Sequence, residues 1–190
     1  VKVAKKLKIP IFMYEKSAIV KDRQNLANIR KGEYEGMSEK LKLKKWKPDY
    51  GSSKLNIKSG VTAIGVREFL IAYNINLNTS DKKLASDIAL DIREAGRAKR
   101  DKNGKIIRDK NNIMVKVPGS LKAVKAVGWY LEEHNIAQVS MNLVNYKMTS
   151  MHKAFEETRQ EAQKRGMRVT GSELVGLIPL KPLLDAGRFF

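Results

Sequence analysis

Residues 69–77 have the sequence FLIAYNINL, a β-branched and apolar stretch that ends in alternating asparagines. Such a run indicates a strand that is buried on both faces until its polar end. A helix is expected next, capped by Ser80 or Asp81 and ending at Gly96, because leucine and isoleucine recur every four residues along it. The stretch therefore predicts a strand followed directly by an amphipathic helix.

Two more strands are expected downstream, at residues 121–131 and 137–146, separated by a short polar turn. A turn of that length predicts an antiparallel hairpin. Thr149 or Ser150 can then cap a second helix, whose early glutamates suit the positive end of its dipole.

The pattern closes with a short strand at residues 169–178, interrupted by Gly171 and Gly176, and a last helix that begins at Pro179. Strand, helix, strand, strand, helix, strand is the split βαβ order. Residues 69–190 are therefore predicted to form a ferredoxin-like βαββαβ unit, an α/β (α+β) sandwich with an extra C-terminal helix.

The first third of the chain shows weaker patterns. A short strand is expected at residues 9–14, followed by a polar, helical or turn-rich stretch at 21–43 that we interpret as peripheral. Residues 46–53 contain proline, aspartate, glycine and paired serines and are predicted to form a loop. Residues 61–66 are β-branched and indicate another strand. No internal repeat is apparent.

Composition limits the class of protein. The 190 residues are 42% hydrophobic, which is enough for a core, and no cysteine is present, which excludes disulfides and thiolate zinc sites. The net charge is +18, of which +10 lies in residues 1–69 and +8 in residues 96–125. Anionic partners are therefore expected, and a lysine-rich solvated surface is the alternative for residues 97–125. No apolar run is long enough for a spanning helix, and we expect a cytoplasmic protein.

Familiar catalytic motifs are missing. The chain has no glycine-rich phosphate loop and no serine elbow, and its two histidines, His134 and His152, lie at a predicted turn and a helix start. Both histidines are interpreted as surface or capping residues. These residues suit binding better than covalent catalysis.

One loop is a candidate ligand site. Two glycines bound a polar segment in which serines and an asparagine could orient a flat ligand and lysines could attract carboxylates. An ordinary solvated turn is the alternative. The residues are Gly51, Ser52, Ser53, Lys54, Leu55, Asn56, Ile57, Lys58, Ser59 and Gly60.

Polar residues also alternate along the predicted strands, Asn74 with Asn76 in one and Gln138, Ser140 and Asn142 in another. Because alternate residues of a strand share a face, each set lies on one side of the sheet. The pattern fits either the border of a polar cleft or a face exposed to water.

Five sequence blocks together resemble the glutamate formimidoyltransferase family, which includes the formiminotransferase part of bifunctional formimidoyltransferase-cyclodeaminases. They occur in the family's order from about residue 5 to residue 190, which makes chance similarity improbable. The blocks are RKGEYEG (30–36), PDYG (48–51), REFLIAYNINL (67–77), QVSMNL (138–143) and GSELVGLIP (171–179).

The resemblance implies transfer of a formimidoyl group between N-formimidoyl-L-glutamate and tetrahydrofolate during histidine degradation, by a homodimer with folate bound between two subdomains. Residues 1–68 would be the end of the N-terminal subdomain and 69–190 the C-terminal subdomain, with 97–118 an inserted basic loop or hairpin. Residues 51–60 would bind the folate co-substrate. The family's acid/base histidine would lie upstream, so these residues alone are expected to be inactive.

Two other functions stay open. A ferredoxin-like sheet with basic flanks is a common RNA-binding platform, and the charge would give salt-dependent affinity for nucleic acid. Against this, no RNP1-like run of aromatic residues lies on a predicted strand. The third alternative is a structural module that dimerises without turnover.

Overall fold

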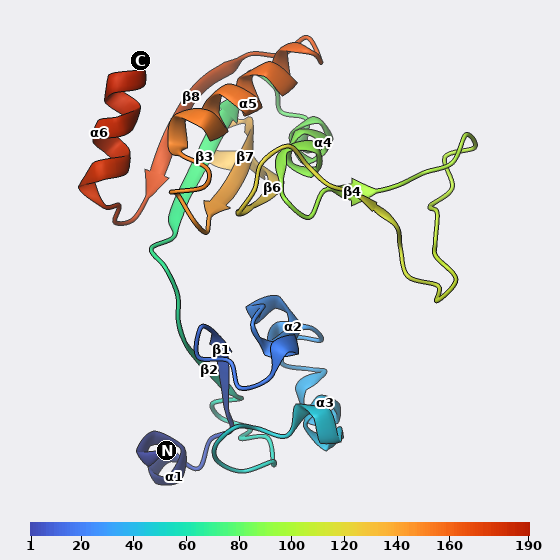
Figure 1. The fold of residues 1–190 in the computed structure, drawn as a ribbon, viewed down its shortest axis with the longest axis vertical. Coiled ribbons are helices and arrows are strands. Elements are labelled where there is room, and N and C mark those ends of the chain that lie inside the picture. Colours follow the sequence, from blue (N-terminus) through green and yellow to red (C-terminus); the bar gives the residue numbers. More distant parts are fainter. The chain divides into compact units, whose positions relative to one another are not determined.

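A computed structural model describes residues 1–190 and divides them into two compact units, Val1–Arg67 (unit 1) and Glu68–Phe190 (unit 2). Figure 1 shows the elements of each. No helix of either unit is both long enough and apolar enough to cross a membrane.

Unit 2 contains the ferredoxin-like fold expected from the sequence. Its sheet has the order β6-β7-β3-β8, with each neighbouring pair antiparallel, so that the first and third strands of the βαββαβ motif lie at the centre. The strands and helices in chain order are β3 (Ile71–Leu77), α4 (Lys82–Ile92), β6 (Val124–Leu131), β7 (Ile136–Leu143), α5 (Met151–Gln163), β8 (Val169–Val175) and α6 (Leu180–Phe189).

Helices α4 and α5 cover one face of this sheet and bury the core. Ile75 and Val139 on the strands, Ile88 on α4 and Ala154 on α5 are all fully buried in a single apolar cluster. The side chain of Asp81 accepts a hydrogen bond from the Lys83 N–H at the start of α4, which confirms the predicted cap. The opposite face of the sheet has no helix packed on it within unit 2.

Strand β8 differs from its expected form. It passes through Gly171 without interruption, because Gly171 keeps its register opposite Asn76, and the irregularity falls one residue on, between Asn76 and Leu77. Strand β8 ends at Val175, directly before Gly176. Helix α6 then packs on α5 through ring contacts, with Phe189 stacked on His152 at 4.6 Å between ring centroids.

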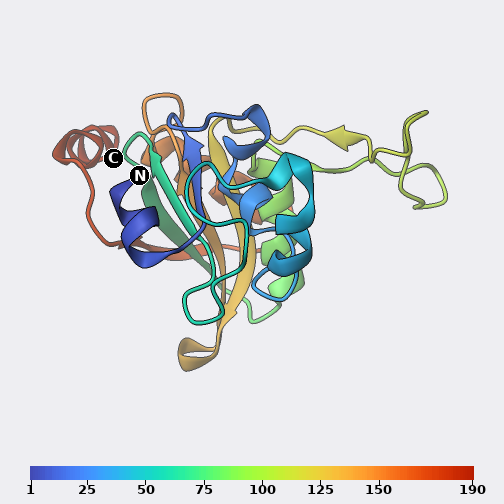
Figure 2. The same ribbon diagram turned by 90° about the horizontal axis from the view of Figure 1, so that it is seen from below.

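Residues 97–118 form a projecting hairpin, which we call the basic arm. Strands β4 (Arg97–Ala98) and β5 (Lys116–Val117) pair at its root, and the remainder extends beyond the rest of unit 2 (Figures 1 and 2). The arm agrees with the exposed hairpin or loop expected from its charged sequence.

Unit 1 is built around two parallel strands, β1 (Ile11–Glu15) and β2 (Thr62–Val66), paired from Ile11 with Thr62 to Glu15 with Val66. Short helices surround them: α1 (Lys2–Leu7), η1 (Lys21–Arg23), α2 (Leu26–Arg30), α3 (Met37–Lys42) and η2 (Lys44–Trp46).

The interpretation of residues 21–43 as peripheral is wrong. Ile29 in α2 and Met37 and Leu41 in α3 are at most 5% exposed and form the core of unit 1 with Phe12 of β1. The helices are only five or six residues long, so no periodic apolar stripe can appear in the sequence. Each contributes one or two buried residues instead.

Lys40 shows how the short helices are held. Its ammonium donates hydrogen bonds to the carbonyls of Asn28, Ile29 and Lys31 at the end of α2, and it lies 4.1 Å from the centroid of the Trp46 ring. Burial, reinforced by the charge of Lys31, lowers the pKa of Lys40 below its usual value. Lys40 thus joins α2, α3 and η2 through one side chain.

Candidate functional site

The candidate loop, residues 51–60, lies in unit 1 between η2 and strand β2. Gly51 begins it with φ of +87°, and a Cβ at this position would lie 2.1 Å from the carbonyl oxygen of Ile9. Only glycine combines that backbone conformation with so close an approach. The first glycine therefore fixes the loop against the start of β1, which was not foreseen when it was interpreted as space for a ligand.

Two side chains predicted to orient a ligand accept hydrogen bonds from the loop's own backbone. Ser52 Oγ accepts a hydrogen bond from the Lys54 N–H, and Asn56 Oδ1 accepts from the N–H groups of Lys58 and Ser59. The Gly60 N–H closes the turn on the carbonyl of Asn56 at 2.6 Å. Ser52 and Asn56 thus form local side-chain turns, a use that is typical of these residue types.

The middle of the loop is anchored by Leu55 and Tyr34. Leu55 is half-buried against the apolar core of unit 1, whereas Ile57 beside it is 82% exposed. The hydroxyl of Tyr34 donates a hydrogen bond of 2.8 Å to the Ile57 carbonyl, and its ring lies against Gly60. The sequence alone does not predict this contact between Tyr34 and the loop.

A hollow lies on each side of the loop. The first measures about 400 Å³ and is lined by Arg30, Glu33, Tyr34, Met37, Lys58, Ser59, Gly60 and Val61. The second measures about 590 Å³ and is lined by Ala4, Lys5, Lys8, Gly51, Ser52, Lys54, Leu55 and Asn56. Both hollows are surface depressions within unit 1, and together they involve most of the predicted site residues.

The charge of the two hollows is mainly positive. Arg30 and Lys58 line the first, against the single carboxylate Glu33, while Lys5, Lys8 and Lys54 line the second. An anionic ligand is therefore attracted to either side of the loop. Backbone groups and the hydroxyl of Ser59, which lines the first hollow, are available for hydrogen bonds there.

The open face of the unit 2 sheet carries a second polar cluster. Trp129 Nε1 donates to Gln138 Oε1 at 2.6 Å, and Gln138 Nε2 donates to Asn76 Oδ1 at 2.6 Å. Asn74 Nδ2 donates to Glu173 Oε1 at 2.8 Å, and Gln138 Nε2 also reaches that oxygen at 3.3 Å. These contacts form one hydrogen-bonded row across all four strands, which we call the sheet-face network.

The sheet-face network shows that the alternating polar residues do not all face water. Gln138 is 1% exposed and Asn74 is 6% exposed, so neither simply faces water. Ser140 lies opposite Asn74 on the same face, and Asn142 is exposed further along β7. The network offers a polar floor whose one charged member is the carboxylate of Glu173.

Neither histidine belongs to either cluster. His134 is exposed in the η3 turn (Glu132–His134), whereas His152 Nε2 lies 2.9 Å from Ser150 Oγ and its ring stacks on Phe189. The capping and surface interpretation is compatible with these positions. No group of three or more histidines, aspartates and glutamates could hold a metal ion.

The chain is thus a mixed α/β protein with a basic loop between two cationic hollows in one unit and a polar sheet face in the other. The family described as "Formiminotransferase domain" matches residues 72–190, and its "N-terminal subdomain" matches residues 1–67. The chain belongs to the formiminotransferase family, as its sequence blocks indicated.

Curated relatives agree. Over 189 residues, the whole of this chain, it is 47% identical to a formimidoyltransferase-cyclodeaminase of Mus musculus and 42% identical to a glutamate formimidoyltransferase of Streptococcus pyogenes serotype M1. A glutamate formimidoyltransferase of Thermoplasma acidophilum is 37% identical over 191 aligned residues. The chain spans 32% of the mouse protein, 56% of the streptococcal one and 55% of the archaeal one. The family supports a transferase of formimidoyl groups.

Proposed function

We propose that the protein to which this chain belongs transfers a formimidoyl group between N-formimidoyl-L-glutamate and tetrahydrofolate, as part of histidine degradation. The observation that carries the proposal is the match of the entire chain, through both units, to relatives named for glutamate formimidoyl transfer. The cationic hollows support it, because both the glutamate substrate and the folate tail are carboxylates.

In the proposed site, residues 51–60 hold the folate co-substrate. Lys54 and Lys58 are placed on opposite hollows and can each meet a carboxylate, while Gly51 and Gly60 fix the two ends of the loop against Ile9 and Tyr34. Of the ten residues, Leu55 is the least suited to direct contact because it packs into the core. Ser52 and Asn56 would act by keeping the loop's shape.

The proposed reaction needs a proton donor. An amine nitrogen of tetrahydrofolate attacks the amidine carbon of formimidoylglutamate, a new C–N bond forms, and the bond to the glutamate nitrogen breaks as that nitrogen takes up a proton. A group with a pKa near neutrality suits this step. In the family's pattern that group is a histidine outside these residues, and the positions of His134 and His152 give neither of them the role. We accordingly expect residues 1–190 alone to be inactive.

The test uses the whole protein and follows tetrahydrofolate-dependent release of glutamate from N-formimidoyl-L-glutamate. Exchanging both loop lysines, Lys54→Gln with Lys58→Gln, should raise the KM for tetrahydrofolate about tenfold or more, since two ion pairs to a carboxylate are lost. The matched control is Lys44→Gln with Lys47→Gln, which removes the same charge outside both hollows. Absence of glutamate release by the unaltered protein would overturn the proposed reaction, and equal KM values in the two variants would overturn the loop assignment.

Assembly as a homodimer in the cytoplasm is part of the same proposal. Sedimentation of the whole protein tests the dimer directly. The nucleic-acid alternative is less favoured, because the open face of the sheet carries only one aromatic side chain, Trp129, where RNA-binding sheets of this fold stack bases on two or three.

A further inference from the structure

The basic arm contains a repeat that was missed in the sequence. Arg-Asp-Lys-Asn occurs at residues 100–103 and again at 108–111, eight residues later. Each copy folds into its own tight hairpin, closed by a bridge between Arg100 and Ile106 in the first and between Arg108 and Met114 in the second. The arm is therefore a pair of equivalent turns.

Equivalent hydrogen bonds hold the two turns. Asp101 Oδ1 accepts from the N–H groups two and four residues on, at 2.9 Å each, and Asp109 Oδ1 does the same at 2.8 Å each. Arg100 Nη1 donates to the Gly104 carbonyl, and Arg108 Nη1 donates to the Asn112 carbonyl. Each turn is thus stabilised by one aspartate carboxylate and one arginine guanidinium.

The two turns and the root meet at a closed ring of backbone hydrogen bonds. The Lys99 N–H donates to the Val115 carbonyl, the Ile107 N–H to the Lys99 carbonyl, and the Val115 N–H to the Ile107 carbonyl, all within 2.9 to 3.0 Å. The three residues are spaced by eight, like the repeat. Because each of the three residues is hydrogen-bonded to the other two, the arm keeps its shape although it has no apolar core of its own.

The root of the arm is also fixed to the body of unit 2. Arg97 lies 2.5 Å from Asp91 of α4, a charge contact that is not aligned as a hydrogen bond, and its Nη2 donates to the Asp87 carbonyl. Asp91 in turn pairs with Arg165, which also binds Glu161 at the end of α5. The arm is therefore presented in a set direction by both helices.

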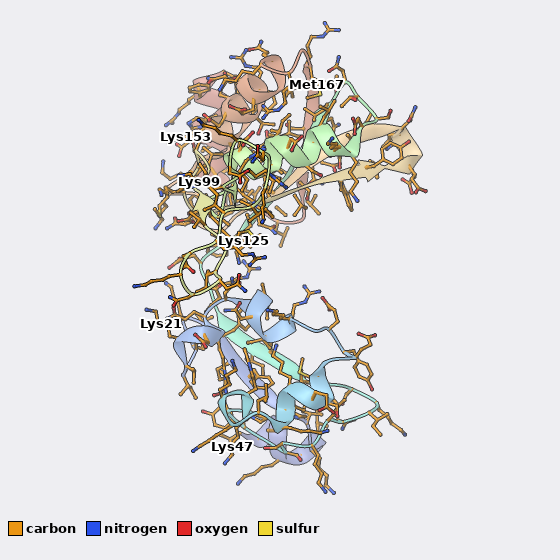
Figure 3. The ribbon with its side chains drawn as sticks, turned by 90° about the vertical axis from the view of Figure 1, so that its right-hand side faces the viewer. Lys21, Lys47, Lys99, Lys125, Lys153 and Met167 are labelled. Atoms are coloured by element: carbon orange, nitrogen blue, oxygen red, sulfur yellow. The ribbon has the colours of Figure 1, made fainter.

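The ordered arm carries a positive surface. Residues 97–118 hold eight basic and two acidic side chains, a net charge of +6, and both acidic side chains are used inside the turns. Five lysines, Lys99, Lys102, Lys105, Lys110 and Lys116, are exposed and make no contact with a carboxylate. Figure 3 looks toward the arm and labels Lys99 on it and Lys125 on the following strand β6. A surface fixed beforehand loses less entropy on binding than a mobile charged loop.

From this surface we infer that the basic arm is a docking site for an acidic segment of another protein. The arm also exposes apolar side chains beside these lysines, Ile113 at 62% and Val117 at 46%, a combination that suits a peptide with glutamates and aliphatic residues. Nucleic acid is a poorer match, since residues 97–118 contain no aromatic side chain for base stacking and Arg100 and Arg108 are occupied by backbone carbonyls.

The first experiment separates the effect of the arm's shape on binding from the effect of its charge. Fluorescence anisotropy measures binding of a labelled peptide of alternating glutamate and leucine to the full chain. Asp101→Ala with Asp109→Ala raises the net positive charge but removes both turn caps, and it should weaken binding about tenfold because the lysines are no longer held in place. Asp101→Asn with Asp109→Asn adds the same charge but keeps a capping oxygen, and it should bind at least as tightly as the unaltered chain. If both variants bound the peptide more tightly than the unaltered chain does, net charge alone would determine the affinity. That result would overturn the inference.

The second experiment locates the binding. Changing the five exposed arm lysines to Gln should weaken the peptide about tenfold or more, as the loss of several ion pairs requires. The control changes Lys2, Lys6, Lys21, Lys44 and Lys47 of unit 1 to Gln, with the same net charge, and should weaken binding less than about threefold. Equal losses, or tighter binding of a uridine oligomer or of phosphatidylserine vesicles than of the peptide, would overturn the inference. Circular dichroism checks the fold of every variant, and no outcome bears on formimidoyl transfer.

Discussion

Asp49 forms a buried ion pair with Arg23 in unit 1, with 2.6 Å between Asp49 Oδ1 and Arg23 Nη1 and both side chains at most 5% exposed. The second carboxylate oxygen of Asp49 accepts the N–H of Met13, and Arg23 Nη2 donates to the carbonyls of Lys45 and Lys47. The pair joins η1, strand β1 and the segment leading to the candidate loop. It therefore fixes the position from which residues 51–60 begin.

Removing the acidic partner should destabilise unit 1 strongly. Asp49→Ala leaves the Arg23 guanidinium buried without its counter-charge, and we expect a loss of about 3–5 kcal/mol in the free energy of unfolding. Urea unfolding followed by Trp46 fluorescence in a Trp129→Phe background reports this unit, because the chain has one tryptophan in each unit. The control is Asp22→Ala, which removes an exposed carboxylate next to Arg23 in the sequence. It should change the free energy of unfolding by less than about 0.5 kcal/mol. A loss below about 1 kcal/mol for Asp49→Ala would show that the pair is not needed.

The sheet-face network should stabilise unit 2 through Gln138. Gln138→Leu removes the acceptor of the Trp129 indole N–H and the donor to Asn76, so polar atoms in part-buried hydrogen bonds lose their partners. The expected loss is about 2–3 kcal/mol, measured by urea unfolding with Trp129 fluorescence in a Trp46→Phe background. Ser140→Ala lies on the same face without a side-chain hydrogen bond and serves as the control. Equal unfolding of the two variants would contradict a stabilising network.

The fold of unit 2 could be predicted because its elements are long. Strands β3, β6 and β7 have seven or eight residues and helices α4 and α5 have eleven and thirteen, enough to show periods in the sequence. In unit 1 hydrophobic periodicity does not reveal the core, since Ile29 and Leu41 come from helices of one or two turns. Arg23 was missed for a related reason: a buried arginine is visible only once its partner, 26 residues away, is in place.

The candidate site could be predicted in outline but not in its contacts. The glycines and lysines of residues 51–60 marked the loop, yet the hydrogen bond from Tyr34 to Ile57 depends on how α3 and the loop pack. The repeat in the arm was legible in the sequence as two copies of Arg-Asp-Lys-Asn. A charged stretch without apolar periodicity predicts only an exposed hairpin or loop, whereas here the aspartate caps give each turn a defined shape.

Gly128 on strand β6 should tolerate no side chain. A Cβ there would lie 2.1 Å from the backbone nitrogen of Ser86, because β6 passes directly against helix α4. Gly128→Ala must therefore push α4 away from the sheet, and we expect a loss of about 3 kcal/mol in unit 2. Gly187→Ala gives the opposite expectation, a gain of about 0.5–1 kcal/mol, since Gly187 lies in helix α6 with open space around it. Differential scanning calorimetry measures both, and an unchanged melting temperature for Gly128→Ala would contradict the close packing.

Glu161 should make unit 2 sensitive to acid. Burial alone would raise the pKa of Glu161, but hydrogen bonds from Lys164 and Arg165 outweigh it and lower the pKa below its usual value. A carboxyl whose pKa is lower in the folded state stabilises the fold above its unfolded pKa, and this contribution is lost as pH falls from that value through the folded pKa. Glu161→Gln should therefore cost about 1 kcal/mol near neutral pH and almost nothing in acid well below the unfolded pKa of about 4.3. Urea unfolding at the two pH values, followed by Trp129 fluorescence in the Trp46→Phe background, measures the difference. Glu133→Gln, which removes an exposed carboxylate in the η3 turn, is the control, and an equal cost of Glu161→Gln at both pH values would rule out the ion pair as its source.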